Sequence, residues 1–484
     1  MEKIKNYING EWVESKSDRV LDVENPGTGE ILAQVPLSTK KEADLAARVA
    51  KEAYWQWKEE SILKRIKSFY KLKDLIEKNF DELATLITKE HGKTLNESKG
   101  EMVRLLQGIE SSFGLPSLIQ GQILPNIAPD AVPKIDSYFI REPLGPFVHI
   151  PPFNFPAMIS FWFLPYAVIC GDTFIVKPSE QCPLTMNRIF ELIDEVGFPR
   201  GVLNLINGGK EVVDALLEHP DIAGVCSVTS TPTAKYIYAK GSSFSKRMCC
   251  QGGAKNFILV SESCNLEKSV PNIMDSVYGN ANQRCMAGSN VVAIGGIYGK
   301  LKEELVRAAK NIKVGYGLDP KTTMGPLSSA KAEERVLNYI DIGIKEGAKL
   351  ILDGRDVKVE QEGHYLGPCI FDEVNPEMTI AKEEIFGPVM LIMKAQTLEE
   401  AIKMANRSRF GNAAILYSSL GKEADEFEKK IECFCLGINI GLPAPIAWFP
   451  FSGGKDSFFG VLHGQLPDVV DFFTNKKAVI KRWF

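Results

Sequence analysis

The stretch "FVHIPPFNFPAMISFWFLPYAVICGDTFIVKPSE" (147–180) has a short apolar run near each end and a long uncharged segment between them. The two runs, "FVHI" and "TFIVKP", have the length and the β-branched and aromatic content of buried strands. Further runs of this kind lie at 202–206 and 223–228, and the segments 183–196 and 211–218 carry apolar residues at helical spacing. Strands that alternate with helices predict an α/β fold with a parallel sheet covered on both faces.

The segment from Pro143 to Gly171 carries no charged residue and is long enough to cross a bilayer. It also contains six prolines, which would break a lipid-exposed helix at several points. We therefore expect a buried strand, a loop and a buried helix here, and no membrane span.

Two long amphipathic helices are predicted before this segment, over residues 40–58 and 61–91, and Gly92 offers a stop signal. Near the N-terminus, "YINGEWV" (7–13) places bulky residues around Asn9-Gly10, which is typical of a β-hairpin.

A second series of alternating strands and helices begins at "NFILV" (256–260). The C-terminal stretch "VVDFFTNKKAVIKRWF" (469–484) predicts a β-rich end, and a strand this apolar usually pairs with another strand. With 484 residues, the chain is long enough for at least two domains with cores of their own.

The composition is that of an ordinary globular protein, with 45% hydrophobic and 24% charged residues and a formal net charge of -4. Neither nucleic acid nor an anionic membrane is indicated as a partner. The ten cysteines include no C-x-x-C pair and the five histidines lie far apart, so we expect no disulfide framework and no metal site. These features fit a protein of the reducing cytoplasm.

Common nucleotide fingerprints are missing: no G-x-G-x-x-G follows a strand, and "HGKT" (91–94) and "SGGKDS" (452–457) lack the upstream glycine of a P-loop. Lys177 and Glu180, however, follow a predicted strand at its carboxyl end, where ligands sit in open α/β sheets. The ammonium could meet phosphate or ribose and the carboxylate could accept from ribose hydroxyls. A solvated loop is the alternative.

Asn154 lies between prolines and phenylalanines in "PPFNFP" (151–156), where the backbone is stiff. A rigid amide suits an oxyanion site, because its donor must be aimed before charge develops. A structural asparagine in a turn is the other interpretation.

Cys285 lies in "NQRCMAGSN" (282–290), directly after Arg284. A free cysteine often packs as a small hydrophobe. The adjacent positive charge favours a nucleophile instead, since it would lower the pKa of the thiol. Arg104, in "GEMVR" (100–104), is by itself an arginine on a helix surface.

Taken together, these motifs resemble the aldehyde dehydrogenase superfamily, in the same order along nearly the whole chain: "PPFNFP", "FIVKPSE", "SVTSTP", "GGAKN", "NQRCMA", "EEIFGPV" and "FPFSGGKDSFFG". Within the superfamily the chain is most similar to the CoA-acylating methylmalonate-semialdehyde dehydrogenase branch, through "GAKN", the residues around Cys285, "GEMVR" and "LPAPIAWFPFSG".

The resemblance implies that Cys285 is the nucleophile and that Asn154 holds the oxyanion with the backbone N–H of Cys285. It implies NAD as cofactor, bound by Phe153, Lys177, Glu180, Ser230, Glu384 and Phe386. Arg104 and Arg284 would bind the carboxylate of a semialdehyde, because a planar guanidinium recognises a carboxylate bidentately.

One position separates hydrolytic from acylating relatives. Gln251, in "QGGAK" (251–255), stands where hydrolytic relatives carry a glutamate base, and glutamine cannot take a proton from water. A thioester on Cys285 would then wait for coenzyme A. With loss of carbon dioxide from the acyl group, the product would be acetyl-CoA or propionyl-CoA.

The resemblance also implies two Rossmann-type parallel-sheet domains and a small β oligomerisation domain in a homotetramer. The NAD-binding domain would comprise 1–112 and 143–250, the catalytic domain 251–445, and the oligomerisation segments 113–142 and 446–484.

Two other functions stay open. One is a hydrolysing aldehyde dehydrogenase that yields a free acid by means of another base. The other is a non-catalytic binding protein on this fold, because Thr229 and Ala234 stand where the family usually has glycines.

Overall fold

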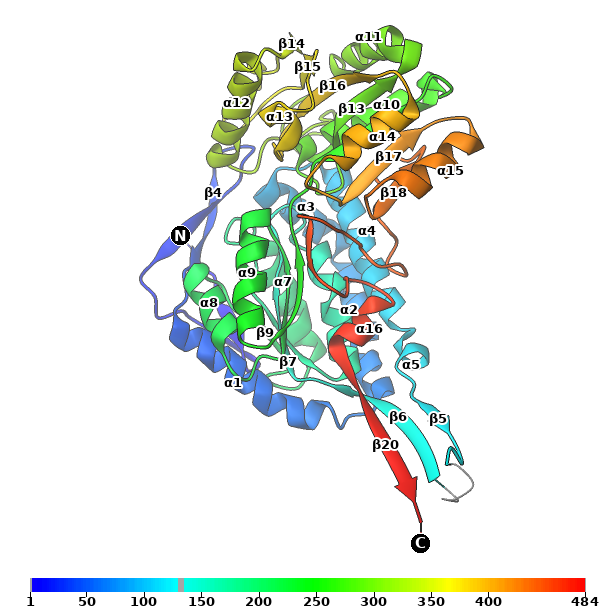
Figure 1. Cartoon of the computed structure of the whole chain (residues 1–484). Coiled ribbons are helices and arrows are strands. Elements are labelled where there is room, and N and C mark those ends of the chain that lie inside the picture. The colour runs from blue at the N-terminus through cyan, green and yellow to red at the C-terminus, as the bar shows by residue number, and fades with distance from the viewer. Residues whose placement is uncertain (1, 129–134, 484) are drawn as a thin grey trace.

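A computed structural model describes residues 2–128 and 135–483 of the protein. The chain forms two lobes, each built on its own β-sheet, and a narrow β arm that extends from the first lobe (Figure 1). Residues 129–134, within one of the predicted oligomerisation segments, lie outside the described residues, as do residues 1 and 484.

The first lobe contains an eight-stranded sheet of strand order β19-β11-β10-β7-β8-β9-β1-β2. Its five inner strands are parallel, as the sequence predicts: β7 (Pro146–Ile150), β8 (Thr173–Val176), β9 (Leu203–Leu205), β10 (Gly224–Val228) and β11 (Arg247–Gln251). The edges are antiparallel: β1 (Asn6–Ile8) and β2 (Glu11–Val13) form the expected hairpin, and β19 (Phe458–Gly460) pairs with β11.

Helices cover both faces of this sheet. Successive side chains along β8 point to opposite faces of the sheet, and both faces are apolar: Phe174 and Val176 lie in the core on one face and Ile175 lies in the core on the other. The face of Ile175 is covered by α1 (Lys40–Trp57), α8 (Lys210–Glu218) and α9 (Thr231–Ser243). The opposite face packs against α2 (Ile62–Lys78), α3 (Phe80–His91), α4 (Leu95–Ser112), α6 (Leu164–Cys170), α7 (Leu184–Val196) and α16 (Asp468–Phe473).

The prediction of a single helix over residues 61–91 is wrong, since the chain forms two helices, α2 and α3, that meet at Asn79. Asn79 has φ -102° and ψ 18°, outside the helical region, and its side chain donates to the Leu75 carbonyl at 2.8 Å. Asparagine favours such local side-chain bonds at helix ends, which competes with continuation of the helix.

The uncharged segment from Pro143 to Gly171 lies in the interior. It forms β7, a loop, a 3-10 turn (Met158–Trp162) and the buried helix α6, which confirms the predicted strand, loop and helix. Among the described residues, none of the helices combines the length and the apolar character needed to cross a membrane.

The second lobe contains a seven-stranded sheet of order β14-β15-β16-β13-β12-β17-β18, parallel except for β14. The strands are β12 (Asn256–Val260), β13 (Gly288–Ile294), β14 (Lys349–Leu352), β15 (Cys369–Asp372), β16 (Val389–Ala395), β17 (Ala413–Tyr417) and β18 (Cys435–Ile438). The helices include α10 (Leu266–Tyr278), α11 (Tyr298–Ala309), α12 (Ala330–Lys345), α14 (Leu398–Asn406) and α15 (Gly421–Lys430).

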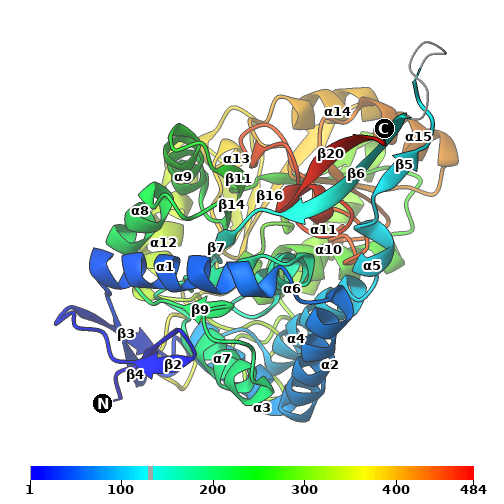
Figure 2. The same cartoon turned by 90° about the horizontal axis from the view of Figure 1, so that it is seen from below.

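The arm consists of β5 (Gln122–Leu124), β6 (Ile135–Pro143) and β20 (Thr474–Arg482), which lie side by side in Figure 2. β20 pairs antiparallel with the whole of β6, so the C-terminal strand does find a partner. The residues before it were expected to be extended, but Asp468–Phe473 form helix α16, which buries Val469, Val470 and both phenylalanines. A role of this arm in oligomerisation, and the division into domains, remain predictions.

The carboxyl ends of the parallel strands of the first sheet share one edge. The loop after β7 carries Asn154, the loop after β8 carries Lys177 and Glu180, and the turn after β10 carries Ser230. The fold therefore collects at one edge residues that are far apart in the sequence.

The corner between α3 and α4 depends on Gly92. This residue follows α3 as its C-cap with φ +96°, and an added Cβ would lie 2.7 Å from Pro326 Cγ and 2.9 Å from Pro26 Cγ. Gly197 is a matched case, because it caps α7 with φ +77° and an added Cβ there would meet open space.

We expect Gly92→Ala to lower the free energy of unfolding by about 2–4 kcal/mol, from left-handed strain plus overpacking. Gly197→Ala should cost about 1 kcal/mol, from the backbone alone. Urea denaturation followed by circular dichroism measures both variants. Equal losses would contradict the steric part of this argument.

Candidate active site

A cavity of about 640 Å³ lies at the carboxyl edge of the first sheet and is lined by both lobes. It brings together eight of the residues singled out from the sequence: Phe153, Asn154, Lys177, Glu180, Ser230, Cys285, Glu384 and Phe386. A second cavity of about 300 Å³ is lined by Arg104, Arg284 and, again, Cys285. Cys285 therefore lies where the two cavities meet.

Lys177 and Glu180 form an ion pair beyond the end of β8. Lys177 Nζ lies 2.8 Å from Glu180 Oε1, and the lysine is buried while the carboxylate is partly exposed to the cavity. In the part of the chain that the structure describes, the other oxygen of Glu180 has no partner, so the pair presents an acceptor and donors side by side. Hydroxyl groups on adjacent carbons, as in a ribose, match such a set.

Ser230 is the N-cap of α9 and is exposed at the cavity wall. Its hydroxyl donates to Thr233 Oγ1 at 3.1 Å. The N-terminus of a helix of this length favours an anion, because its first N–H groups lack partners and the helix dipole is positive there. Thr229, beside Ser230, lines the same wall and its N–H donates to the Gln251 carbonyl, whereas Ala234 is fully buried.

Glu384 reaches the cavity from the second lobe. Its Oε1 accepts from the N–H of Ala254 at 2.9 Å, and burial raises the pKa of the carboxyl, against lowering contributions from that N–H and from Arg335 and Lys255. Phe386, two residues on, stands edge-on to Phe153 with ring centroids 6.0 Å apart.

The main chain of Cys285 is fixed by two buried amides. Its carbonyl accepts from Asn256 Nδ2 at 2.8 Å and from Asn412 Nδ2 at 2.9 Å. Asn256 begins β12 and Asn412 directly precedes β17. Two neighbouring strands of the second sheet thus hold the peptide that carries the sulfur.

The thiol of Cys285 is protonated at neutral pH in the protein alone. Burial, the charge of Glu384 and the nearby Cys435 together raise its pKa to about 12, although the main-chain N–H groups of Cys285 and Met286 lower it in part. The expectation that Arg284 would lower this pKa is wrong. Its guanidinium is directed to Glu97 at 2.9 Å and to Asp275 at 3.6 Å.

Asn154 is buried and its side chain is fixed at one of its two N–H groups. Nδ2 donates to the Gln283 carbonyl at 2.8 Å, two residues before the cysteine. Within residues 2–128 and 135–483, the second N–H of this amide has no acceptor, and Asn154 and Cys285 line the same cavity. Asn154 therefore lies in the wall of the cavity, and its role toward an oxyanion stays a prediction.

The smaller cavity carries both arginines. Arg104 lies on α4, and among the described residues its side chain donates only to Gln107 Oε1, at 3.3 Å, so most of its guanidinium remains available. Arg284 is largely neutralised by Glu97. The two arginines face one space, but they differ in how free their charge is.

Gln251 is buried and turned toward the C-terminal segment. Its Nε2 donates to the Phe451 carbonyl at 2.9 Å. An amide held in this way has no proton-accepting role toward water.

Some residues of the site carried too weak a signal in the sequence. Asn256 and Asn412 bind the same carbonyl but come from strands that are 156 positions apart, and an asparagine at a strand boundary usually indicates a turn. The position of Glu97, three residues after Thr94, is typical of a capping box, and the two residues do form one. Its contacts with Arg284 and with the N–H of Asn280 depend on the tertiary structure.

The family model described as "Aldehyde dehydrogenase family" matches residues 12–479. A malonate-semialdehyde dehydrogenase of Halalkalibacterium halodurans is 44% identical over 482 residues, covering 100% of this chain and 99% of its own.

Solved structures agree with this match. The methylmalonate-semialdehyde dehydrogenase of Oceanimonas doudoroffii has a TM-score of 0.97 at 37% identity, covering 100% of this chain and 99% of its own. A Sinorhizobium meliloti protein assigned the same activity, solved with NAD, has a TM-score of 0.97 at 38% identity and covers 100% and 98%. By sequence, by fold and by the cysteine at the junction of its two cavities, the chain belongs to the aldehyde dehydrogenase family and is an oxidoreductase.

Proposed function

We propose that the protein oxidises malonate or methylmalonate semialdehyde with NAD and passes the acyl group to coenzyme A. The observation that carries this proposal is the position of Cys285 between a cavity that holds the Lys177–Glu180 pair and a cavity with two arginines. The relatives described above bear these substrates in their names, which supports the same choice.

The residues of the larger cavity fit NAD. Lys177 and Glu180 would hold the adenosine ribose, and the end of α9 at Ser230 would receive the pyrophosphate. Glu384 and Phe386 would hold the nicotinamide ribose and ring, with Phe153 packed against Phe386. When bound, NAD would supply the hydride acceptor of the oxidation.

In this proposal the sulfur of Cys285, once deprotonated, attacks the aldehyde carbon. The developing oxyanion would accept from the unpaired N–H of Asn154 and from the main-chain N–H of Cys285, which is directed to the sulfur side. Loss of the aldehyde hydrogen as hydride leaves a thioester on Cys285.

The substrate carboxylate would be bound by Arg104, whose guanidinium is mostly free, with Arg284 beside it. A carboxylate β to the thioester carbonyl can leave as carbon dioxide, because the carbonyl accepts the electron pair. One proton then completes the acetyl or propionyl group. Attack by the thiol of coenzyme A releases Cys285, so malonate semialdehyde, NAD and coenzyme A give acetyl-CoA, carbon dioxide and NADH.

The buried, hydrogen-bonded Gln251 supports thiol transfer over hydrolysis. A hydrolysing aldehyde dehydrogenase is the second candidate. It is favoured by Glu384, a carboxyl in the same cavity whose raised pKa suits a general base.

Product identity tests the proposal. With malonate semialdehyde and NAD, we expect rapid turnover only when coenzyme A is present, with acetyl-CoA equal to the NADH formed. Absorbance of NADH and liquid chromatography of the thioester measure the two products. Equal turnover without coenzyme A, with a free acid as product, would favour the hydrolysing candidate.

Arg104→Leu should raise the KM for malonate semialdehyde about 10- to 100-fold, because charge-assisted hydrogen bonds to its carboxylate are lost. The KM for propanal, which has no carboxylate, should change less than about twofold on the same grounds. Arg188→Leu, in a surface ion pair on α7, is a control for loss of an arginine elsewhere. A similar rise for both aldehydes would remove Arg104 from carboxylate recognition.

The raised pKa of Cys285 predicts the pH dependence of its alkylation by iodoacetamide, a neutral reagent that reacts with the thiolate. Because only the thiolate reacts, the rate without NAD should rise about tenfold per pH unit up to about pH 10. Mass spectrometry of the Cys285 peptide measures this rate without interference from other thiols. A plateau below about pH 9, as for an ordinary or activated thiol, is the result that would refute it.

A further inference from the structure

The sequence "HGKT" (91–94), which has the outline of a P-loop, is the corner between two helices. Gly92 ends α3 and Thr94 is the N-cap of α4, where its side chain and that of Glu97 form a capping box. The two helices thereby place Lys93 at the corner, and its side chain enters the interior, where it has 0% exposure.

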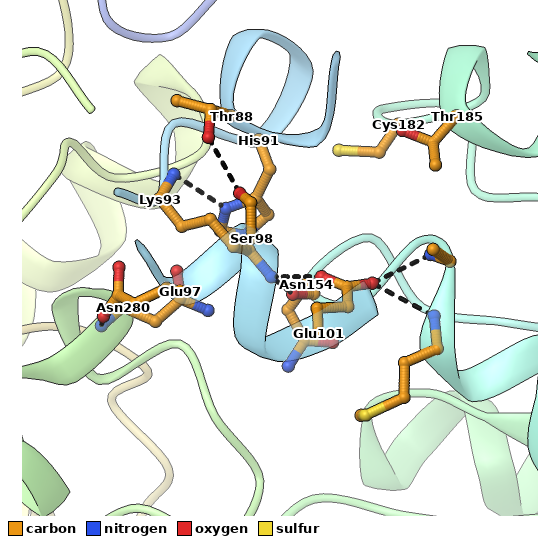
Figure 3. Close-up of polar contacts among 12 residues, drawn as sticks. Thr88, His91, Lys93, Glu97, Ser98, Glu101, Asn154, Cys182, Thr185 and Asn280 are labelled. Carbon is orange, nitrogen blue, oxygen red and sulfur yellow. Dashed lines mark hydrogen bonds and ion pairs between the residues drawn. The ribbon is translucent and has the colours of Figure 1, made fainter. Parts of the chain in front are cut away.

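Lys93 is paired with Glu101, two turns further along α4. Lys93 Nζ lies 2.8 Å from Glu101 Oε2, and both side chains have 0% exposure. The same ammonium donates to the main-chain carbonyl of Asn154 at 2.5 Å (Figure 3). It also lies 4.0 Å from the centre of the Phe155 ring.

The other oxygen of Glu101 binds the same loop at a second place. Oε1 accepts from the N–H of Ala157 at 2.9 Å and from that of Met158 at 3.1 Å. The pair therefore holds the loop after β7 at the carbonyl of residue 154 and at two N–H groups three and four residues later.

A buried ion pair is seldom worth more to stability than apolar side chains of equal volume, because both charges lose their hydration. Its retention here is explained by geometry. The loop of residues 151–157 has neither helical nor strand structure, so its main chain needs partners from elsewhere to occupy one position.

We infer that Lys93 and Glu101 are a positioning pair that fixes Asn154 against Cys285. The inference rests on the proposed function, in which Asn154 donates to the oxyanion. The pair acts through the main chain of Asn154, whose amide is held at its other end by the carbonyl of Gln283. An oxyanion donor that moves by a fraction of its hydrogen-bond length loses much of its effect.

Both residues also line the smaller cavity, so direct contact with the substrate is the competing explanation. A double-mutant cycle separates the two. The measurement is single-turnover formation of NADH from propanal without coenzyme A, which avoids both the substrate carboxylate and the acyl-transfer step.

We expect Lys93→Met to slow this step about 10- to 100-fold, somewhat less than loss of the donor itself in Asn154→Ala. In the Asn154→Ala background, Lys93→Met should slow it less than about twofold further, because its effect passes through Asn154. Alkylation of Cys285 by iodoacetamide, which needs no oxyanion donor, should be unchanged. Full additivity of the two substitutions, or a normal rate in Lys93→Met, would overturn the inference.

Glu101→Gln is the second variant, for the event that Lys93→Met does not fold. The glutamine carbonyl can still accept from Ala157 and Met158, but its amide cannot accept from Lys93, so the same slow step is expected. Glu90→Gln is the matched control. Glu90 is a buried carboxylate on the adjacent helix that accepts from the N–H groups of Leu184 and Thr185, away from the loop of Asn154.

Glu90→Gln should retain the single-turnover rate within about twofold. A loss in this control equal to that in Glu101→Gln would indicate a general structural effect and overturn the inference. If Asn154→Ala itself retains the normal rate, the proposed role of Asn154 fails and the inference fails with it. If Asn154→Ala is slow but Lys93→Met and Glu101→Gln are normal, only the positioning role fails.

Discussion

The site depends on the carbonyl of Cys285, which accepts hydrogen bonds from two buried asparagines, Asn256 and Asn412. Because these asparagines adjoin neighbouring parallel strands, the peptide of the cysteine is fixed to two inner strands of the second sheet. The sulfur is thereby placed at the edge of the second lobe that faces the carboxyl ends of the first sheet. The other residues of the site must therefore approach the fixed cysteine, and the first lobe carries them on the loops after β7, β8 and β10.

The positive charge of Arg284 is balanced by nearby carboxylates, which the sequence did not indicate. Arg284 stands next to Cys285 in the chain, yet its guanidinium is paired with Glu97 and Asp275 and leaves the thiol protonated. A protonated thiol is also poorly reactive toward electrophiles.

The helix α4 connects the two halves of the proposed chemistry. Glu97 and Glu101 are four residues apart and so lie on one face of the helix. Glu97 binds the segment before Cys285 through Asn280 and Arg284, while Glu101 binds the loop of Asn154 together with Lys93. A single rigid element thus contacts the segments that carry the nucleophile and the amide donor, which couples their positions.

Local sequence determined much of the fold. The alternation of apolar runs and helical segments, the hairpin at Asn9-Gly10 and the stop at Gly92 each follow from the preferences of neighbouring residues, and the structure confirms them. Two predictions were wrong for different reasons. At Asn79 two local preferences compete, because the asparagine interrupts a helix whose apolar spacing continues. Residues 468–473 form a helix because Val469, Val470 and the phenylalanines pack against the first sheet.

The candidate site was predictable to the extent that its residues stand in unusual local settings. Cys285, Asn154, Lys177 and Glu180 lie in motifs or at strand ends and could be named from the sequence, together with the family. The sequence could not indicate that Arg284 would be neutralised, that Asn256 and Asn412 would share one carbonyl, or that Lys93 would be buried against Glu101. The contacts of Arg284 and of the two asparagines join segments far apart in the chain, and Lys93 and Glu101 are buried because the loop of Asn154 packs against them, so only the tertiary structure decided these features.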